Sequence, residues 1–399
     1  MPTRPPVSAR AKNKNMKLVS FCRRIRLVIQ SGLSKTTISV NPGERIVLDD
    51  ITAQVLPGDP QIESISDFGP YYQNFVQRPT KWRNKRVLFY RPRGIGDQLI
   101  ASCLSRFFTE MLGAKCYQLA DRVHEPIWLG NPYIDGAPIS VPIGIDSLVR
   151  FKGRPFYDYA FFLESVSEWD SSAEQENVYD RLFAMIGFRE VPNRFKSPIF
   201  QVSQADRNAY QDWIAKLSLA TGIDFLARGY IFHQMRATNI GRTIPLKQQA
   251  LVLNELDKLD IPILCTDDKA LEPAAAEMVR QVKNAHDVSG QIDNIRLFGT
   301  MVANSRMTVS PDSLAIHFAA AAQIPALSLW GPFDPESRIK YYPRQIGLNH
   351  PERCANAFCH NYMPTLPTHL CPEGENQKYC ACYDGVTAEE IRKAISALL

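Results

Sequence analysis

Residues 309 to 321 hold the chain's most distinctive set of chemical groups. A short β-branched run is followed by a Ser-Pro-Asp-Ser turn and then by an alanine-rich segment, which predicts a strand, a turn and a helix that begins near Asp312 and Ser313. Free backbone N–H groups and the helix dipole make such a helix start a binding site for an anion. His317 follows one turn later and is expected to face the same site. The alternative is that Asp312 only caps the helix and that His317 is an ordinary buried histidine.

The segment after this helix predicts a second buried strand, at residues 326–330, which ends in a turn at Gly331. A strand, an anion-binding turn, a helix of small residues, another strand and a glycine loop follow one another here. This order is typical of the donor half of a nucleotide-sugar site.

A glycine-containing turn at residues 91–97 opens an earlier βαβ unit. It follows the apolar run 87–90 and precedes apolar residues that fall on one face of a predicted helix from residue 99 to 112. The turn ends in Asp97, so this carboxylate is expected where the strand gives way to the helix. The alternative for Asp97 is a role as helix N-cap.

Alternating strands and helices must position these turns. Strands are predicted at 229–233, 261–265, 286–288, 307–310 and 326–330, with helices at 246–259, 271–283, 292–303 and 313–322. Such alternation predicts a parallel sheet that is covered on both faces. The segment from about residue 81 repeats the pattern and ends after a helix at 204–219. We therefore expect an α/β protein with two Rossmann-like, doubly wound domains facing a cleft, at 81–222 and 223–345.

The chain outside these domains has a different character. Residues 1 to about 15 are rich in Pro, Arg, Lys and Asn and are expected to be disordered. Short apolar runs at 27–29, 37–40, 45–48 and 51–56 predict a small antiparallel β unit, and 57–80 read as a linker. Residues 1–80 thus form a basic tail, a β unit and a linker. Residues 346–399 are expected to form a cysteine-rich finger and a terminal amphipathic helix.

Composition is that of an ordinary globular protein, with 45% hydrophobic and 22% charged residues among 399. No apolar run reaches the roughly 18 residues that span a bilayer. The basic N-terminus lacks the apolar core and cleavage site of a signal peptide, so a cytoplasmic location with reduced cysteines is expected. A net charge of +5 is weak evidence for a nucleic-acid partner, which stays open.

Five of the nine cysteines lie close together in the C-terminal tail. Such a density in a reduced chain indicates a structural zinc or iron ion held by thiolates. The preferred ligands are Cys354, Cys359, Cys371 and Cys382, with Cys380 as a competing fourth. The alternative is free thiols or a tail tied by disulfides.

Several separate motifs resemble those of the ADP-heptose glycosyltransferases, the bacterial heptosyltransferase family. They are residues 91–97, the Arg242-Thr-Ile-Pro245 segment, residues 287–298, the segment 310–321 and Gly331-Pro-Phe-Asp-Pro335, in the family's order. The resemblance covers about residues 85–399. It implies the GT-B fold, in which the terminal helix crosses back to the first domain. It also implies transfer of heptose from ADP-heptose to an acceptor hydroxyl, with inversion and without a catalytic metal.

The resemblance also implies roles for individual residues. Asp97 would be the general base that takes the acceptor proton, which is the chemistry that an inverting transfer needs. Arg242 stands at a basic position that is usually lysine in the family, and its guanidinium would hold phosphate oxygens. Arg236 is a nearby substitute. Asp267 or Asp268 would supply a further acidic contact.

The remaining donor contacts would come from the start of the 313–322 helix. The N–H groups of Ser313 and Leu314 would cradle the diphosphate, although the family usually has glycine at position 314. Asp312 would bind sugar hydroxyls, and His317 would donate a hydrogen bond to phosphate or sugar. Gly96 would allow the substrate to approach closely.

The β unit and the cysteine tail resemble the layout of autotransporter heptosyltransferases, in which the tail is an iron-binding finger. The expected acceptor is therefore a hydroxyl on a protein, or on lipopolysaccharide core. A modified base in DNA is the alternative acceptor, and a non-catalytic protein that binds sugar nucleotides or nucleic acid is the alternative class. Assembly into a homo-oligomer is also left open.

Overall fold

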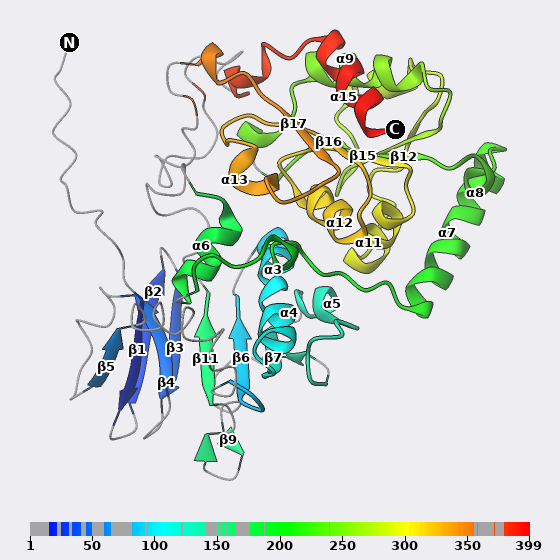
Figure 1. Cartoon of the computed structure of the whole chain (residues 1–399). Coiled ribbons are helices and arrows are strands. Elements are labelled where there is room, and N and C mark those ends of the chain that lie inside the picture. Colours follow the sequence, from blue (N-terminus) through cyan, green and yellow to red (C-terminus); the bar gives the residue numbers. More distant parts are fainter. Residues whose placement is uncertain are drawn as a thin grey trace, which may run out of the picture.

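The computed structural model of the chain consists of two α/β domains, each built on its own sheet (Figure 1). The structure describes residues 16–21, 25–31, 34–40, 45–49, 60–64, 82–91, 94–120, 123–136, 138–140, 150–151, 154–155, 158–163, 176–186, 188–238, 240–354, 357, 371 and 379–399. The disorder expected for residues 1–15 and the strand expected at 51–56 lie outside this part of the chain.

The first sheet has seven strands in the order β5-β1-β4-β11-β6-β7-β8. Its strands are β1 (Met16–Phe21), β4 (Arg45–Asp49), β5 (Pro60–Ser64), β6 (Arg86–Tyr90), β7 (Lys115–Ala120), β8 (Ile139–Ser140) and β11 (Tyr159–Phe162). From β4 to β8 neighbouring strands are parallel, whereas β1 is antiparallel to both β4 and β5. The βαβ unit predicted around Asp97 is therefore the parallel half of this sheet.

The N-terminal β unit was expected to lie outside the first domain, but it is part of that domain's sheet. Strand β4 pairs with β11 across Ile46 and Ala160, so the N-terminal strands extend the sheet of the first domain. Strand β5 also falls in the segment that was expected to be a linker. Two further antiparallel pairs of strands belong to neither large sheet. They are β2 (Ile25–Ser31) with β3 (Ser34–Val40), and β9 (Arg150–Phe151) with β10 (Arg154–Pro155).

The second sheet has six parallel strands in the order β14-β13-β12-β15-β16-β17. They are β12 (Ile231–Gln234), β13 (Ile263–Thr266), β14 (Ala285–Asp287), β15 (Met307–Pro311), β16 (Ala326–Leu329) and β17 (Gln345–Leu348). The first five were predicted; β17 lies partly beyond the predicted end of the domain. The arrangement is the doubly wound one, with the chain leaving the middle of the sheet first in one direction and then in the other.

Helices cover both sheets, and most lie where the apolar periodicity predicts them. They are α3 (Ile95–Ala101), α4 (Cys103–Glu110), α5 (Glu125–Trp128), α6 (Val178–Met185), α7 (Gln204–Thr221), α8 (Phe225–Arg228), α9 (Leu246–Asp257), α10 (Pro273–Arg280), α11 (Ile295–Ala303), α12 (Leu314–Ala322), α13 (Glu336–Ile339) and α15 (Ala388–Leu398). Helix α7 starts at a capping box of Ser203 and Asp206 and ends at Gly222, whose φ of 73° suits a left-handed C-cap.

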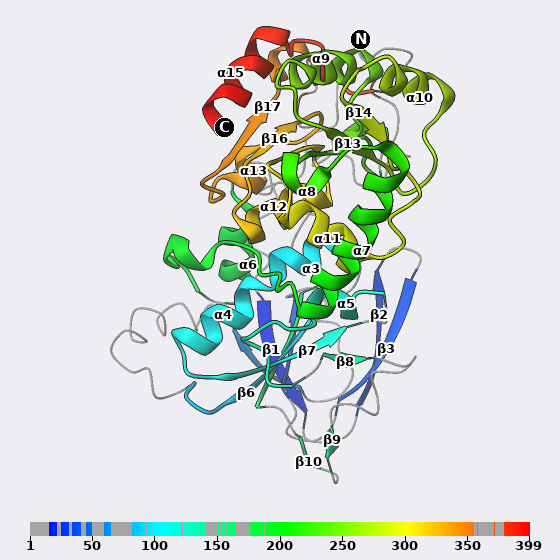
Figure 2. The ribbon, with the colours of Figure 1, turned by 90° about the vertical axis from the view of Figure 1, so that its right-hand side faces the viewer.

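Two helices pack differently from the prediction. Helix α15 packs on α9 of the second domain (Figures 1 and 2), and its Arg392 bonds to Glu255 there, instead of crossing to the first domain. Helix α7 packs on α11 of the second domain, although the expected boundary placed it in the first. The apolar side of α15 finds its core on the cysteine tail and the second sheet, where Ile391 and Ile395 are buried.

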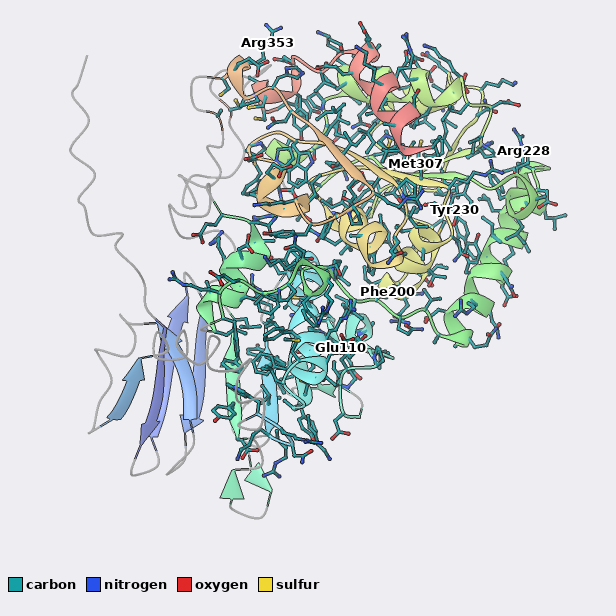
Figure 3. All side chains as sticks on the ribbon, viewed as in Figure 1. Glu110, Phe200, Arg228, Tyr230, Met307 and Arg353 are labelled. Carbon is teal, nitrogen blue, oxygen red and sulfur yellow. The ribbon has the colours of Figure 1, made fainter. Side chains whose placement is uncertain are left out.

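A continuous apolar core joins the two domains. Phe200 lies on the segment that connects them, as its label in Figure 3 shows, and its ring meets Phe318 of α12 with centroids 4.6 Å apart. Beside it, α12 contacts α3 of the first domain, and α11 contacts α5. The first-domain turn that carries Asp97 is thereby brought against the helix start at residue 313.

Candidate active site

The strand orders place the candidate site where ligands bind in open α/β sheets. In the second sheet the direction of winding reverses between β12 and β15, and in the first it reverses between β11 and β6. Crevices beyond the carboxyl ends of such strands are the usual ligand sites. Asp97 follows β6 and Asp312 follows β15, so both predicted carboxylates lie at switch points.

The start of α12 is held by Gln234, at the end of β12. Its Nε2 donates to Ser313 Oγ over 2.8 Å, and its Oε1 accepts from the backbone N–H of Ala315 over 3.2 Å. Ser313, not Asp312, is the N-cap, and Leu314 is the first helical residue. Apart from the N–H of Ala315, the first-turn N–H groups lack helical acceptors and are available to an anion. Sequence reasoning missed Gln234, which only the strand order brings beside α12.

Asp312 and Arg242 form an ion pair at the same end of the sheet. The Asp312 carboxylate is buried, with its Oδ2 3.5 Å from Nη1 of Arg242. This oxygen has no hydrogen-bond partner among the described residues. An unsatisfied buried carboxylate oxygen is costly, so a hydroxyl donor from a ligand would be stabilised there.

Asp97 lies in the first turn of α3 and does not cap the helix, whose N-cap is Gly94. Its Oδ2 pairs with Nη2 of buried Arg91 at 3.1 Å, and Nη1 of Arg91 donates to the carbonyl of Leu163 over 2.6 Å. Gly94 has a φ of 60°, and a Cβ there would overlap the Asp97 carboxylate. The glycine and the arginine thus fix the carboxylate at the edge of the helix. Arg91 was not predicted as a site residue.

Gly96 and His317 bring the two halves of the site together. A Cβ added to Gly96 would lie 3.2 Å from Cδ2 and 3.6 Å from Nε2 of His317. The charges of Asp97, Asp312 and Arg242 all act on the His317 imidazole. The structure therefore gathers the predicted residues from both domains around one side chain.

His317 is a neutral imidazole at physiological pH. Burial, partly opposed by the charge of Asp312, lowers its pKa from 6.5 to about 4. Its Nδ1 shares a 2.9 Å hydrogen bond with the hydroxyl of Tyr342. Neutral imidazole has one donor and one acceptor nitrogen, so His317 can donate to an anionic ligand without itself carrying charge.

Arg236, the predicted substitute for Arg242, is held elsewhere. Its guanidinium pairs with Asp267, and lies 3.6 Å from Asp268 and 3.6 Å from Glu272. Burial raises the pKa of Asp267, while hydrogen bonding to Asp267 raises that of Arg236. Arg236 is therefore held by the acidic side chains that follow β13, and Arg242 is the cation beside the start of α12.

The cysteine tail packs under the second domain. Cys354, Cys371, Cys380 and Cys382 are all buried; the Cys380 thiol interacts with those of Cys371 and Cys382, and the Cys382 thiol with that of Cys354. Cys359 lies outside the described residues. Within the described part of the chain, no three potential ligands are arranged to hold a metal ion. The structure thus places three of the four preferred ligands, and the competing Cys380, in one buried cluster.

Solved structures with the same fold support the two-domain architecture. E. coli ADP-heptose lipopolysaccharide heptosyltransferase II matches with a TM-score of 0.55 and 15% identity over 78% of this chain and 98% of its own. TibC of enterotoxigenic E. coli, an iron-containing dodecameric glycosyltransferase, matches with a TM-score of 0.55 and 14% identity over 99% of this chain and 98% of its own. TibC in complex with ADP-D-β-D-heptose matches with a TM-score of 0.54 and 13% identity over 97% of this chain and 92% of its own.

Sequence comparison adds the family. No curated protein matches the chain. No helix in the described residues is long and apolar enough to cross a membrane. The family model for glycosyltransferase family 9 (heptosyltransferase) matches residues 156–362, slightly more than half of the chain. The chain therefore belongs to glycosyltransferase family 9, the heptosyltransferases.

Proposed function

We propose that this protein transfers heptose from ADP-heptose to an acceptor hydroxyl with inversion at the anomeric carbon. One observation supports this most: Gly96, the neighbour of Asp97 in the first domain, lies against His317 of the second domain, on the helix that follows the ion pair of Asp312 and Arg242. A base and an anion site that meet across a domain contact are what a displacement at a sugar carbon requires.

Asp97 is the general base of the proposed reaction. Its Oδ2 is held by Arg91, and its Oδ1 has no ion-pair or hydrogen-bond partner among the described residues. Oδ1 takes the proton of the acceptor hydroxyl while the acceptor oxygen bonds to the anomeric carbon. The bond from that carbon to the diphosphate oxygen breaks at the same time, and the nucleoside diphosphate leaves with the electron pair.

The second domain stabilises the leaving group. Negative charge grows on the diphosphate as it leaves, and fixed cations and N–H dipoles stabilise such charge most effectively. Arg242 is the cation, and His317 and the first-turn N–H groups of α12 other than that of Ala315 are the donors. The unsatisfied Oδ2 of Asp312 accepts a hydrogen bond from a sugar hydroxyl. No catalytic metal is part of this mechanism.

The proposed acceptor is a protein hydroxyl. The N-terminal strands and the cysteine tail follow the layout noted for autotransporter heptosyltransferases, and TibC, which aligns over 99% of this chain, supports that choice. Lipopolysaccharide core and modified DNA bases are the competing acceptors. TibC is dodecameric, and we propose a homo-oligomer here too, which light scattering of the purified protein tests.

A structural iron or zinc in the tail is also proposed. Four buried thiols interact in pairs there, and thiolates are soft ligands of the type that these ions prefer; the backbone N–H of Ala381 also lies 3.5 Å from Cys371 Sγ. Cys354, Cys371 and Cys382, with Cys359 or Cys380, would hold the ion and tie the tail together. Elemental analysis should find about one ion per chain, reduced in Cys371→Ser and unchanged in the matched control Cys265→Ser. A metal-free native protein would contradict the site.

Mass spectrometry of acceptors tests the proposed activity. Protein, truncated lipopolysaccharide and duplex DNA are each incubated with the enzyme and ADP-heptose, with UDP-glucose as the control donor. The expected result is a heptose adduct on the protein acceptor from ADP-heptose only. An adduct on DNA, or salt-sensitive DNA binding without any turnover, would favour one of the two alternative functions.

A further inference from the structure

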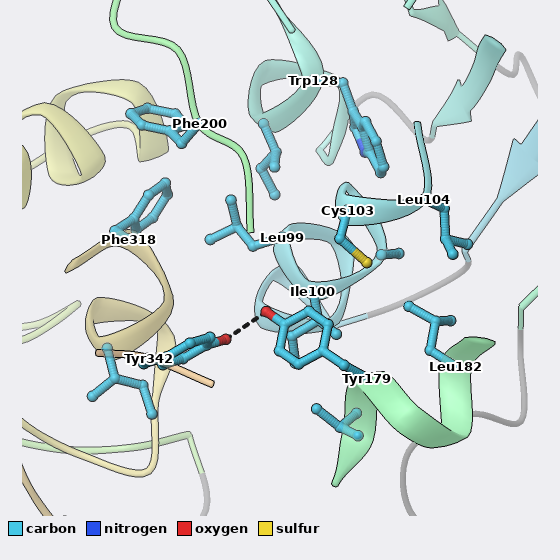
Figure 4. Packing of buried hydrophobic residues seen from close by; sticks show 14 of the residues in the cluster. Leu99, Ile100, Cys103, Leu104, Trp128, Tyr179, Leu182, Phe200, Phe318 and Tyr342 are labelled. Atoms are coloured by element: carbon cyan, nitrogen blue, oxygen red, sulfur yellow. Dashed lines mark hydrogen bonds between the residues drawn. The ribbon is translucent and has the colours of Figure 1, made fainter. Parts of the chain in front are cut away.

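Two tyrosines and a histidine form a buried hydrogen-bonded line that ends at the candidate site. The hydroxyls of Tyr179 and Tyr342 are 2.6 Å apart, and the Tyr342 hydroxyl lies 2.9 Å from Nδ1 of His317. Figure 4 shows the first of these bonds among apolar side chains, including Leu99, Ile100 and Cys103. Tyr179 belongs to α6 of the first domain, whereas Tyr342 and His317 belong to the second.

The direction in which the protons point follows from where acceptors exist. If His317 Nδ1–H donated to Tyr342, Tyr342 would donate to Tyr179, and the Tyr179 proton would need a further acceptor. Among the described residues, the Tyr179 hydroxyl has no partner except Tyr342. A buried hydroxyl proton without an acceptor costs about 1–3 kcal/mol. In the opposite direction both hydroxyl protons have acceptors, and the proton left over is on Nε2 of His317, which is not among the fully buried polar atoms without a partner and can therefore reach solvent or a ligand.

In that direction Tyr179 donates to Tyr342, and Tyr342 donates to Nδ1 of His317. Nδ1 is then the acceptor nitrogen, so the proton of the neutral ring is on Nε2. No described residue accepts a hydrogen bond from Nε2. This nitrogen is also the one that faces Gly96, beside Asp97.

We propose that Tyr179 and Tyr342 are positioning residues that hold His317 in the tautomer with the proton on Nε2, so that it donates to an anionic oxygen of the nucleoside diphosphate. This inference rests on the proposed function for the identity of the ligand, but the tautomer itself does not. Because Tyr179 is in the other domain, the line is complete only while the domains are in contact. A residue of the first domain, Tyr179, therefore helps to orient the second-domain histidine that binds the nucleoside diphosphate.

The neighbouring tyrosine offers a matched control. The Tyr341 hydroxyl donates to Asp180 Oδ2 over 2.6 Å, and Lys196 lies 2.6 Å from Oδ1 of the same carboxylate. Tyr341→Phe thus removes a hydroxyl that bridges the same two domains, without touching His317. Tyr342→Phe removes the hydroxyl that bonds His317.

Nitrogen NMR of protein labelled with ¹⁵N-histidine tests the proposal, with His317 assigned from a His317→Gln spectrum. In the unliganded wild type, Nδ1 should show the shift of an unprotonated ring nitrogen and Nε2 that of a protonated one, and the Nδ1 resonance should move in Tyr342→Phe but stay in Tyr341→Phe. A proton on Nδ1 in the wild type would overturn the proposal, whether or not the protein uses ADP-heptose.

Calorimetry with ADP supplies the second measurement. Tyr342→Phe should weaken ADP binding about 3–10-fold, the loss expected from one hydrogen bond, and Tyr341→Phe by less than about 2-fold. Equal weakening in both variants would mean that domain contact alone matters, and would overturn the positioning role. If the wild type fails to bind ADP, the proposed donor is wrong, and the NMR result still decides the tautomer.

Discussion

The Tyr383 hydroxyl donates a 2.6 Å hydrogen bond to the carbonyl oxygen of Arg242, although 141 positions separate the two residues. The same tail segment closes on Gly331, where a Cβ would lie 2.6 Å from Tyr383 Cε2 and 2.9 Å from Cys380 Cβ. The cysteine tail therefore supports the turn that carries the candidate phosphate-binding cation. The tail is therefore an integral part of the second domain.

Removing this hydrogen bond should weaken donor binding. Tyr383→Phe leaves the ring in place but frees the Arg242 turn, so the dissociation constant for ADP should rise about 2–10-fold, measured by calorimetry. Tyr230→Phe is the matched control, because its buried hydroxyl also donates over 2.6 Å to a backbone carbonyl, that of Met301. Equal ADP affinities for the two variants would contradict the role of Tyr383.

Replacing Gly96 by a larger residue should lower turnover, and the alanine variant should do so without a loss of stability. Gly96→Ala places a methyl group about 3.2 Å from His317 Cδ2 but improves helix propensity by roughly 0.5–1 kcal/mol. Gly96→Val adds more bulk at the same contact. We expect turnover to fall from wild type to alanine to valine, while the melting temperature of the alanine variant stays near that of the wild type. Full turnover in Gly96→Val would show that the contact with His317 is not needed.

Arg296 links the domains and should contribute strongly to stability. From α11 it pairs with Asp206 and donates to the carbonyls of Gln201, over 2.6 Å, and Pro126, over 3.0 Å. Arg296→Ala leaves these partly exposed acceptors without their cation and should lower the free energy of unfolding by about 1–3 kcal/mol, measured by urea denaturation. Arg280→Ala, which breaks an exposed pair with Glu277, should change it little. Similar values for both variants would contradict the linking role.

Two buried histidines should make the protein less stable in mild acid. Burial lowers the pKa of His233, as of His317, from 6.5 to about 4. Between these values the unfolded chain binds more protons than the native one, so stability is full above about pH 6.5 and falls as the pH drops toward 4. His233→Gln should remove on the order of 2 kcal/mol of the difference in unfolding free energy between pH 7.5 and pH 5.0. An unchanged difference would contradict the buried neutral state.

Local patterns predicted most of the second domain. The apolar periods of α9 to α12 and the buried runs of β12 to β16 carry a strong local signal, and the turn before Ser313 marked the helix start correctly. Strand β17 was missed because Gln345-Ile-Gly-Leu348 is short and lies between loop-forming residues. The extension of the first sheet was missed because it depends on the pairing of Ile46 with Ala160, which no local pattern encodes.

The site was predicted only in part for the same reason. Asp97, Asp312 and His317 could be proposed from the sequence because each lies in a recognisable turn or helix start. Gln234 and Tyr383 were not, because they act on α12 and on the Arg242 turn from distant parts of the chain. A buried tyrosine or glutamine has no spacing that marks its partner, and only the folded sheet order brings the pairs together.

Single-turnover kinetics of Asp97→Ala, combined with its affinity for ADP, tests the central claim most directly. Asp224→Ala is the control, because Asp224 is also a carboxylate at a helix start, that of α8, far from the site. The rate of heptose transfer should fall about 10²–10⁴-fold in Asp97→Ala, while ADP affinity stays within about 2-fold of the wild type and Asp224→Ala transfers normally. Transfer at the wild-type rate by Asp97→Ala would contradict the assignment of Asp97 as the base.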